Sequence, residues 1–384
     1  MFLKQKEQLE IMDGSKSTLK NINIIIAGGG TGGHLFPALA IGEEILTRNS
    51  NIKIHYVGSL FGLESKVFPI KDVWHTLLPI RGFQRDISIK SFLRNALLPF
   101  RILRSFHKTN NLINDFSPDI IIGTGGYASA LPLFVASTNK KNIPIILQEQ
   151  NSSPGITTKW FAKRAKKVCV AFKDNRSKIL GNIVHTGNPI RKDLTKGNKS
   201  QGYKNFYFNK MYKTIFLFGG SQGSSYLNNI LSQIVKEFEN ASIQVIWQTG
   251  DHEFCKYKKY SSKKIHVTPF INNMSEAYAI SDLIICRSGA LTISEITVCG
   301  KPSILIPFSH AAGDHQTKNA QLLVKSNAAK LILEKNLNKK NLLYTVMNLI
   351  HNEKALNQMR KASKAIGKPN AASKIVDHIL QEKL

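Results

Sequence analysis

The sequence predicts an α/β protein with two doubly wound domains of parallel sheet that are separated by a cleft. Short apolar runs of strand length alternate with segments long enough for crossover helices along most of the 384 residues. One opening pattern, an apolar strand followed by a glycine loop and a helix start, occurs at 24–40 and again at 214–226. Because 384 residues fit two domains of ordinary size, each repeat is expected to open its own domain.

The first domain is expected over residues 21–190, after a loose N-terminal extension over residues 1–20. Its opening strand Ile24–Ala27 leads into the loop Gly28–His34, which offers backbone N–H groups and a helix start to an anion. The further strands of this domain are expected at Lys53–Val57, Val73–Leu78, Asp119–Gly123, Ile143–Leu147, Val168–Ala171 and Ile183–Thr186.

A polar stretch over residues 191–212 is expected to link the two domains, and the second domain is expected over residues 213–365. It opens with Thr214–Phe218 and the glycine loop Gly219–Ser225, and a helix begins near Tyr226. Its further strands are expected at Ile243–Gln248, Lys264–Val267, Asp282–Cys286, Ser303–Ile306 and Ala329–Leu333. Residues 366–384 are expected to form a helix that packs back on the first domain. Ligands of such domains bind at the carboxyl ends of the strands, so two facing domains share one cleft.

The chain is strongly basic, with 53 Lys and Arg against 25 Asp and Glu and a formal net charge of +28. This charge attracts anions such as nucleic acid, anionic lipid or phosphorylated small molecules, although solvated surface lysines explain it equally well.

The four cysteines are scattered and suggest neither a zinc site nor a disulfide framework. Asp314-His315-Gln316 with His310 lacks the spacing of a metal site, so no metal or other cofactor is expected.

The segment from Ile80 to Lys108 interleaves basic and apolar residues. On a helix, Arg94, Arg101 and Arg104 fall on one stripe opposite a wide apolar face, and Phe83 precedes them. This is typical of a helix that lies on a membrane surface, but an ordinary crossover helix with a solvated basic face fits as well. Pro99 should kink or split such a helix. No transmembrane helix and no secretory signal are expected, because no apolar run is long and uninterrupted enough.

The spacing Gly28-x-Gly30-x-x-Gly33 also fits a dinucleotide site. That site requires an acid at the end of the second strand, where this chain has Val57-Gly58-Ser59, which argues against a nicotinamide cofactor. His34 lies at the helix start behind the loop, where it is a candidate to accept a proton or to contact a phosphate.

The segment Cys286–Glu295 likewise follows a buried strand and opens a helix. Its small residues expose N–H groups, and Glu295 suits the two vicinal hydroxyls of a ribose. The alternative is structural, because Thr292-x-x-Glu295 is also the spacing of a capping box.

Seven motifs occur in order from about Ile22 to the C-terminal helices: Gly28-Gly29-Gly30-Thr31-Gly32-Gly33-His34-x-x-Pro37-Ala38-Leu39-Ala40, Gly125-Gly126-Tyr127, Glu149-Gln150-Asn151, Gly187-Asn188-Pro189-Ile190-Arg191, Phe218-Gly219-Gly220-Ser221-Gln222-Gly223, Cys286-Arg287-Ser288-Gly289-Ala290-Leu291-Thr292-x-Ser294-Glu295 and Asp314-His315-Gln316-Thr317-Lys318-Asn319-Ala320. Together they resemble the MurG family of peptidoglycan glycosyltransferases. The resemblance implies the GT-B architecture of two Rossmann-like domains. It also implies an inverting transfer of N-acetylglucosamine from UDP to the 4-hydroxyl of the muramoyl unit in undecaprenyl-diphospho-muramoyl-pentapeptide.

The resemblance assigns the sugar-nucleotide donor mainly to the second domain, with Glu295 on the ribose and Gln316 on the sugar. The donor positions it implies are Thr31, Gly32, Gly33, Asn151, Arg191, Ser221, Gln222, Ile271, Ala290, Leu291, Thr292, Glu295 and Gln316. The acceptor-side positions it implies are Gly30, His34, Tyr127 and Asn151. His34 is the candidate general base, and Glu149 is a further catalytic candidate.

The same resemblance implies a peripheral enzyme on the cytoplasmic face of the cell membrane, whose anionic surface would attract the basic segment. A related transferase that acts on another lipid acceptor, such as diacylglycerol, is the alternative. No nucleic-acid partner is expected, because no nucleic-acid motif accompanies the charge. The chain departs from the family at Gln148, where histidine is common, and at Gly313, where an acid is frequent.

Overall fold

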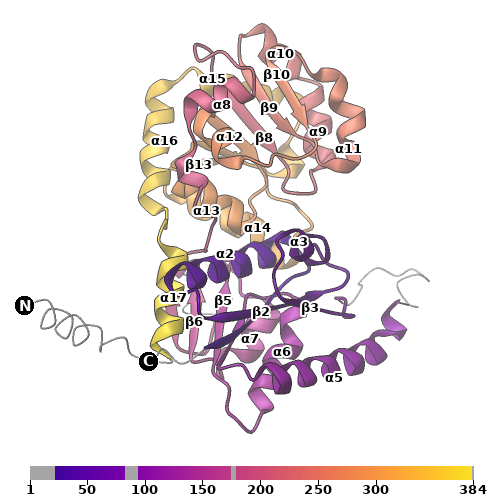
Figure 1. Ribbon diagram of the computed structural model, residues 1–384. Coiled ribbons are helices and arrows are strands. Elements are labelled where there is room, and N and C mark those ends of the chain that lie inside the picture. The colour runs from indigo at the N-terminus through magenta and orange to yellow at the C-terminus, as the bar shows by residue number, and fades with distance from the viewer. Residues whose placement is uncertain (1–21, 83–93, 174–178, 383–384) are drawn as a thin grey trace, which may run out of the picture.

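The computed structural model describes residues 22–82, 94–173 and 179–382. They form two α/β lobes, one above the other in Figure 1, each with a parallel sheet between layers of helices. The fold class expected from the sequence is confirmed.

The N-terminal domain is built on a seven-stranded sheet in the order β3-β2-β1-β4-β5-β6-β7, with every pair parallel. The strands are β1 (Asn23–Ala27), β2 (Lys53–Ser59), β3 (His75–Leu78), β4 (Ile120–Gly123), β5 (Ile145–Glu149), β6 (Lys167–Val170) and β7 (Ile183–His185). The helices are α2 (Gly32–Arg48), α3 (Glu64–Ile70), α5 (Leu98–Phe116), α6 (Tyr127–Thr138) and α7 (Ile156–Phe161). The central strands β1 and β4 carry runs of isoleucine because both faces of this sheet are covered.

The C-terminal domain repeats the plan with six parallel strands in the order β10-β9-β8-β11-β12-β13. The strands are β8 (Thr214–Phe218), β9 (Gln244–Gln248), β10 (Ile265–Thr268), β11 (Leu283–Cys286), β12 (Ser303–Leu305) and β13 (Ala329–Leu331). The helices are α8 (Lys199–Asn205), α9 (Ser225–Ser232), α10 (Val235–Asn240), α11 (Asp251–Tyr257), α12 (Met274–Ile280), α13 (Ala290–Val298), α14 (His315–Lys325), α15 (Lys339–Ile350) and α16 (Glu353–Ile366), and the chain ends with α17 (Ala371–Gln381), which packs on the first domain. Short 3-10 turns lie at Leu194–Lys196, Lys258–Tyr260, Ala312–Asp314 and Glu334–Asn336.

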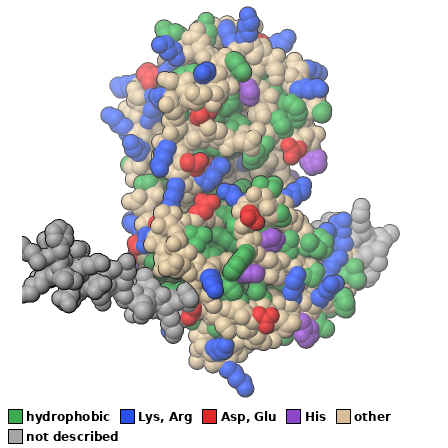
Figure 2. All heavy atoms as spheres, in the orientation of Figure 1, with side chains coloured by type: hydrophobic (Ala, Val, Ile, Leu, Met, Phe, Trp, Pro, Cys, Tyr) green, Lys and Arg blue, Asp and Glu red, His purple; other side chains and the backbone are tan. Residues whose placement is uncertain are grey.

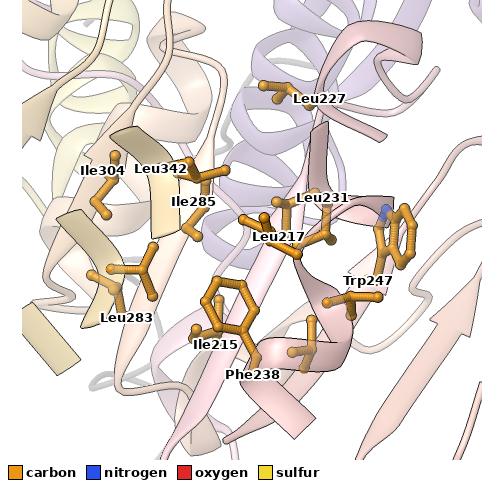
Figure 3. Packing of buried hydrophobic residues seen from close by; sticks show 14 of the residues in the cluster. Ile215, Leu217, Leu227, Leu231, Phe238, Trp247, Leu283, Ile285, Ile304 and Leu342 are labelled. Atoms are coloured by element: carbon orange, nitrogen blue, oxygen red, sulfur yellow. The ribbon is translucent and has the colours of Figure 1, made fainter. Parts of the chain in front are cut away.

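Figure 3 shows how one face of the second sheet forms its core. Leu217, Trp247 and Ile285 come from three neighbouring strands and are fully buried. Phe238 packs against them from α10, and the Trp247 indole N–H donates to the Asn228 side-chain oxygen over 2.9 Å. This core holds β8 and β11 rigidly, and both strands end at the junction of the two lobes.

The stretch over residues 191–212, expected to link the two domains, leads from β7 to β8. Asn198 caps α8 by accepting from the Gln201 N–H, and Leu194, Phe206 and Phe208 are buried in the core of the C-terminal domain. This stretch therefore packs on the C-terminal domain through three apolar anchors within a polar composition.

The chain crosses back to the first domain after α16, as Figure 1 shows. Helix α17 packs on α2, and Ile375, Val376 and Ile379 are buried in a core shared with β1 and β4. Arg48 of α2 also donates to the Asp377 carboxylate over 2.5 Å. The last helix of the chain therefore belongs to the N-terminal domain.

Each strand expected from the sequence is present, and its ends differ from the expected ones by at most two residues. The sequence predicts a kink or a split at Pro99, and the helical run is split close to it: residues 94–96 are helical, Leu97 is a turn, and α5 begins at Leu98. The proline therefore lies in the first turn of α5, where no N–H partner is needed. Among the residues described, no helix is both long enough and apolar enough to cross a bilayer.

Candidate active site

The glycine loop that opens the N-terminal domain is partly committed to the fold. The Gly28 N–H donates to the Val57 carbonyl over 3.0 Å, and the Gly30 N–H donates to both carboxylate oxygens of Glu64 over 2.9 Å. The capacity of this loop to bind an anion therefore rests on Thr31–Gly33, at the amino end of α2, where first-turn N–H groups have no partner inside the helix.

Glu64 is a residue that sequence reasoning missed. Its side chain is fully buried, and besides Gly30 it accepts from the Ser59 N–H over 2.6 Å. A Cβ added at Gly58 or Gly62 would lie 2.4 Å from atoms of Glu64, so these glycines make room for the carboxylate. No acid directly follows the second strand, and Glu64 begins α3, five residues beyond Ser59.

The His34 ring is held in one tautomer by acceptors on one of its nitrogens. Nδ1 lies 3.0 Å from the Thr124 carbonyl oxygen and 3.1 Å from Oε1 of Gln150. The Gln150 amide nitrogen is turned toward the Thr124 carbonyl, 2.6 Å away, which fixes Oε1 toward His34. Both neighbours of Nδ1 accept, so Nδ1 carries the hydrogen, and Nε2 keeps the lone pair that a general base needs.

The second glycine loop lets the chain approach this ring closely. Gly126 has φ of +77°, and a Cβ there would lie 3.0 Å from Cδ2 of His34 and 2.2 Å from the Gly29 carbonyl oxygen. Tyr127 follows as the first residue of α6, and its ring lies against Gly30. The structure therefore brings together the expected acceptor-side residues Gly30, His34 and Tyr127.

Glu149 is buried and has partners within its own loop. One carboxylate oxygen accepts from the Asn151 N–H over 3.0 Å, and the other accepts from the Gly155 N–H over 2.9 Å and from the Thr158 hydroxyl over 2.6 Å. These contacts give Glu149 a structural task, that of shaping the loop after β5, and they lend no support to the expected catalytic role.

Glu295 lies on α13 at the carboxyl edge of the second sheet. Its carboxylate accepts from the Tyr278 hydroxyl over 3.0 Å, and Nη2 of Arg191 lies 3.8 Å away. Burial raises the pKa of this carboxyl, while Arg191 and the Tyr278 hydrogen bond oppose the rise. The capping-box alternative was wrong, because the N-cap of α13 is Gly289 and Thr292 lies inside the helix.

The loop after β8 exposes Ser221 and Gln222. Its position is fixed by Gln248, whose amide donates to the Gly220 carbonyl over 2.9 Å and accepts from the Ile271 N–H over 3.0 Å. Two expected donor-binding positions, the Ser221 loop and Ile271, are thereby tied together at the ends of β8 and β10.

Arg287 lies in the motif Cys286–Glu295, and the sequence alone predicts no role for it. It is buried, pairs with Glu334, and donates to the Ser224 hydroxyl over 3.0 Å and to the Pro307 carbonyl over 3.1 Å. It therefore joins the ends of three strands, β8, β11 and β12. Nearby, the Gln316 side chain accepts from the Phe308 N–H over 3.0 Å.

Hydrogen bonds join the two carboxyl edges directly. The Ser152 N–H of the first domain donates to Oδ1 of Asn319 in α14 over 3.1 Å. Asn188 lies after β7, where the chain leaves the first domain. It donates to the Gln150 carbonyl over 3.2 Å and to the Ser294 hydroxyl of α13 over 3.0 Å. A cavity of about 390 Å³ lies beside this contact and is lined by residues of both domains, among them Phe172, Asn188, Ser294, Leu323 and Ile366. None of the expected donor residues lines it.

The described part of the segment expected at a membrane lies mostly in the first half of α5 and in residues 94–97 just before it. Arg104 is exposed, Arg94 and Arg101 are half-exposed, and Phe83 lies outside the described residues. Leu97, Phe100 and Leu103 are exposed as well. Figure 2 shows basic and hydrophobic side chains together on the edge of the lower lobe where α5 lies.

Over the described ranges, no group of three or more His, Cys, Asp or Glu side chains could hold a metal ion.

Two family models match the chain, one for each domain. The N-terminal domain of glycosyltransferase family 28 matches residues 24–170, and its C-terminal domain matches residues 214–377.

Relatives are similar to the chain over nearly its whole length. A protein of Christiangramia forsetii, named UDP-N-acetylglucosamine--N-acetylmuramyl-(pentapeptide) pyrophosphoryl-undecaprenol N-acetylglucosamine transferase, is 36% identical over 94% of this chain and 97% of its own. A protein of Cytophaga hutchinsonii with the same name is 38% identical over 94% and 97%. The crystal structure of Acinetobacter baumannii MurG matches with a TM-score of 0.72 and 26% identity, over 94% of this chain and 99% of that one.

Replacing Glu64 with glutamine tests the structural task of this carboxylate. Glu64→Gln is expected to destabilise the protein by about 1–3 kcal/mol, because the Gly30 N–H contacts both carboxylate oxygens and the amide NH₂ faces it in either orientation. The control Glu43→Gln alters an exposed pair with Lys71 and should cost less than about 1 kcal/mol. Urea unfolding of both variants measures the difference, and equal stabilities would contradict this role.

Proposed function

Because this chain belongs to glycosyltransferase family 28, we propose that its junction transfers N-acetylglucosamine from UDP-N-acetylglucosamine to the muramoyl 4-hydroxyl of undecaprenyl-diphospho-muramoyl-pentapeptide. The chain is an N-acetylglucosamine transferase of the kind its relatives are named for. The main support for the proposal is the environment of the His34 ring. Both groups that contact Nδ1 are hydrogen-bond acceptors, so Nε2 is left to take a proton.

The donor nucleotide occupies the carboxyl edge of the C-terminal domain. Glu295 binds the ribose hydroxyls, and its position on α13 beside Arg191 supports that role. Arg191 and the Ser221 loop face the diphosphate, where a guanidinium and backbone N–H groups suit an anion. Gln316 binds the sugar. The remaining donor positions, Gln222, Ile271, Ala290, Leu291 and Thr292, line the same edge, and Thr31, Gly32, Gly33 and Asn151 meet the sugar from the other domain.

In the reaction, the acceptor hydroxyl oxygen attacks the anomeric carbon as the bond to the UDP oxygen breaks. His34 takes the hydroxyl proton on Nε2, and UDP leaves as an anion. The amino end of α13 and the Arg191 guanidinium stabilise the charge that develops on the diphosphate. Gly30 and Tyr127 shape the acceptor side, and no catalytic step is assigned to Glu149.

The acceptor carries a lipid tail, and α5 is the surface that meets the membrane. Exposed Leu97, Phe100 and Leu103 supply apolar contacts, and Arg94, Arg101 and Arg104 supply charge that attracts anionic lipid. The enzyme is thus peripheral to the cytoplasmic face of the cell membrane.

A transfer assay tests the proposed function. Radiolabelled N-acetylglucosamine is expected to pass from UDP to the lipid-linked muramoyl acceptor, at the same rate with or without a chelator. Diacylglycerol, assayed in parallel, should remain unlabelled. Labelling of diacylglycerol alone would contradict the proposed acceptor.

Replacing Glu295 tests its contribution to donor binding and, independently, to the stability of the fold. Glu295→Gln should weaken UDP-N-acetylglucosamine binding about tenfold, since hydrogen bonds to a charged group contribute roughly 1.5–3 kcal/mol. Because burial raises the pKa of this carboxyl above its ordinary 4.5, the folded form holds its proton to higher pH than the unfolded form does. Wild-type stability should therefore fall relative to the variant as pH rises above 4.5.

Calorimetric titration of the nucleotide and thermal unfolding across pH measure both effects of Glu295→Gln. Glu276→Gln is the control, since this buried carboxylate accepts from Asn205 of α8, away from α13. It should leave donor affinity unchanged. Unaltered affinity in Glu295→Gln would rule out the ribose contact.

Charge reversal at Arg101 on α5 and at Arg94 just before this helix tests the membrane surface. The double variant Arg94→Glu with Arg101→Glu should lose most of its binding to vesicles that contain anionic lipid, because each basic residue near such a surface contributes about 1 kcal/mol. Co-sedimentation with vesicles measures this loss. A matched reversal at Lys258 and Lys259, which lie on the other domain, should have little effect. Equal binding by the α5 variant and wild type would refute this assignment.

A further inference from the structure

We propose that Gln148, Gln150 and Asn188 form a positioning chain that links the His34 ring to α13 of the other domain. The inference deepens the proposed function and rests on it for the role of His34. All three amides are buried, with exposed fractions of 1%, 2% and 2%.

The chain begins at the ring. His34 Nδ1–H donates to Oε1 of Gln150 over 3.1 Å, and the Gln150 amide nitrogen donates in turn to Oε1 of Gln148. The orientation of the Gln150 amide is not arbitrary, because its nitrogen also faces the Thr124 carbonyl, which can only accept.

The chain continues across the domain junction in the same direction. The Gln148 amide nitrogen donates to Oδ1 of Asn188 over 2.9 Å, and the Asn188 amide nitrogen donates to the Ser294 hydroxyl over 3.0 Å. The Ser294 hydroxyl donates to the Ala290 carbonyl over 2.9 Å. Ser294 and Ala290 both belong to α13, whose first residues are expected to meet the donor.

Every link therefore points from the ring toward α13, and hydrogen bonds aligned in this way polarise and strengthen one another. A single flipped amide would set oxygen against oxygen at one end and N–H against N–H at the other. For buried groups such a mismatch costs about 1–3 kcal/mol. The chain thus has one stable polarity, and that polarity keeps the hydrogen of His34 on Nδ1.

Position 148 must supply one acceptor and one donor to keep this polarity. Glutamine does so, and so does a neutral histidine, which has one nitrogen of each kind. Methionine has a similar volume but supplies neither. With methionine, the Gln150 amide keeps the Thr124 carbonyl but loses the side-chain acceptor at position 148. The preference for its present orientation is then weaker, and the rotated form, which turns NH₂ toward Nδ1 of His34, becomes populated.

The test compares Gln148→Met and Gln148→His with wild type. Gln148→Met should lower kcat by about tenfold or more, within the roughly 10²–10⁴-fold that a general base contributes, and should change the KM for UDP-N-acetylglucosamine much less. Gln148→His should keep most of kcat. Gln201→Met is the matched control, because the Gln201 amide also donates to an asparagine, Asn205, but does so on the exposed surface of α8.

Nitrogen-15 NMR of the ring gives a readout that does not depend on turnover. The His34 signals, identified by their loss in His34→Gln, should report Nδ1–H in wild type and Gln148→His, and a mixture of tautomers in Gln148→Met. If Gln148→Met does not fold, Ser294→Ala removes the far link and should shift kcat in the same direction by a smaller factor.

Unchanged kcat and unchanged ring signals in Gln148→Met, or in Ser294→Ala where it replaces that variant, would overturn the proposal. A wild-type protein that transfers no N-acetylglucosamine to the muramoyl acceptor would refute the proposed function instead. The ring signals would still decide whether the chain of amides exists.

Discussion

The arrangement of this protein depends on buried hydrogen bonds that hold the carboxyl edges of two parallel sheets against each other. Asn188 is central among them, since its amide reaches the Gln150 carbonyl of one domain and the Ser294 hydroxyl of the other. The Ser152 contact with Asn319 joins the same two edges. Because the chain also crosses back so that α17 completes the first domain, the edges are held at two places. Loops that end strands in separate cores can therefore form one site.

The three glycine loops at these edges do different work. The loop before α2 is bound by Glu64, and the part that remains for a ligand is the amino end of the helix together with His34. The loop before α6 has glycine at positions 125 and 126, and the absence of side chains there lets the His34 ring approach closely. The loop after β8 is held by Gln248 with Ser221 exposed. All three loops have the glycine-rich pattern of a phosphate loop, but they differ in use. The glycines before α2 and α6 mainly make room for Glu64 and the His34 ring, whereas the loop after β8 exposes Ser221 to a ligand.

The sequence predicts the strands well because each is a local apolar run bounded by polar or glycine residues, as at Ile24–Ala27 and Thr214–Phe218. It does not predict Glu64, Arg287 or the chain through Gln148, because each depends on partners brought together only by the fold. The Gln150 amide, for example, meets a carbonyl 26 residues away. The capping-box alternative at Thr292 was wrong because helix α13 begins two residues earlier, after Gly289. The polar composition of residues 191–212 does not predict that this stretch packs on the C-terminal domain, which depends on the buried Phe206 and Phe208.

The nucleotide is proposed to bind the C-terminal domain, although the opening loop of the chain looks like a nucleotide loop. Hydrogen exchange of the full-length protein, followed by mass spectrometry with and without UDP, tests it most directly. UDP is expected to slow exchange at Gly219–Ser224 and at the first turn of α13, while exchange at Gly28–Gly33 stays unchanged. Protection at Gly28–Gly33 without protection at α13 would contradict the account.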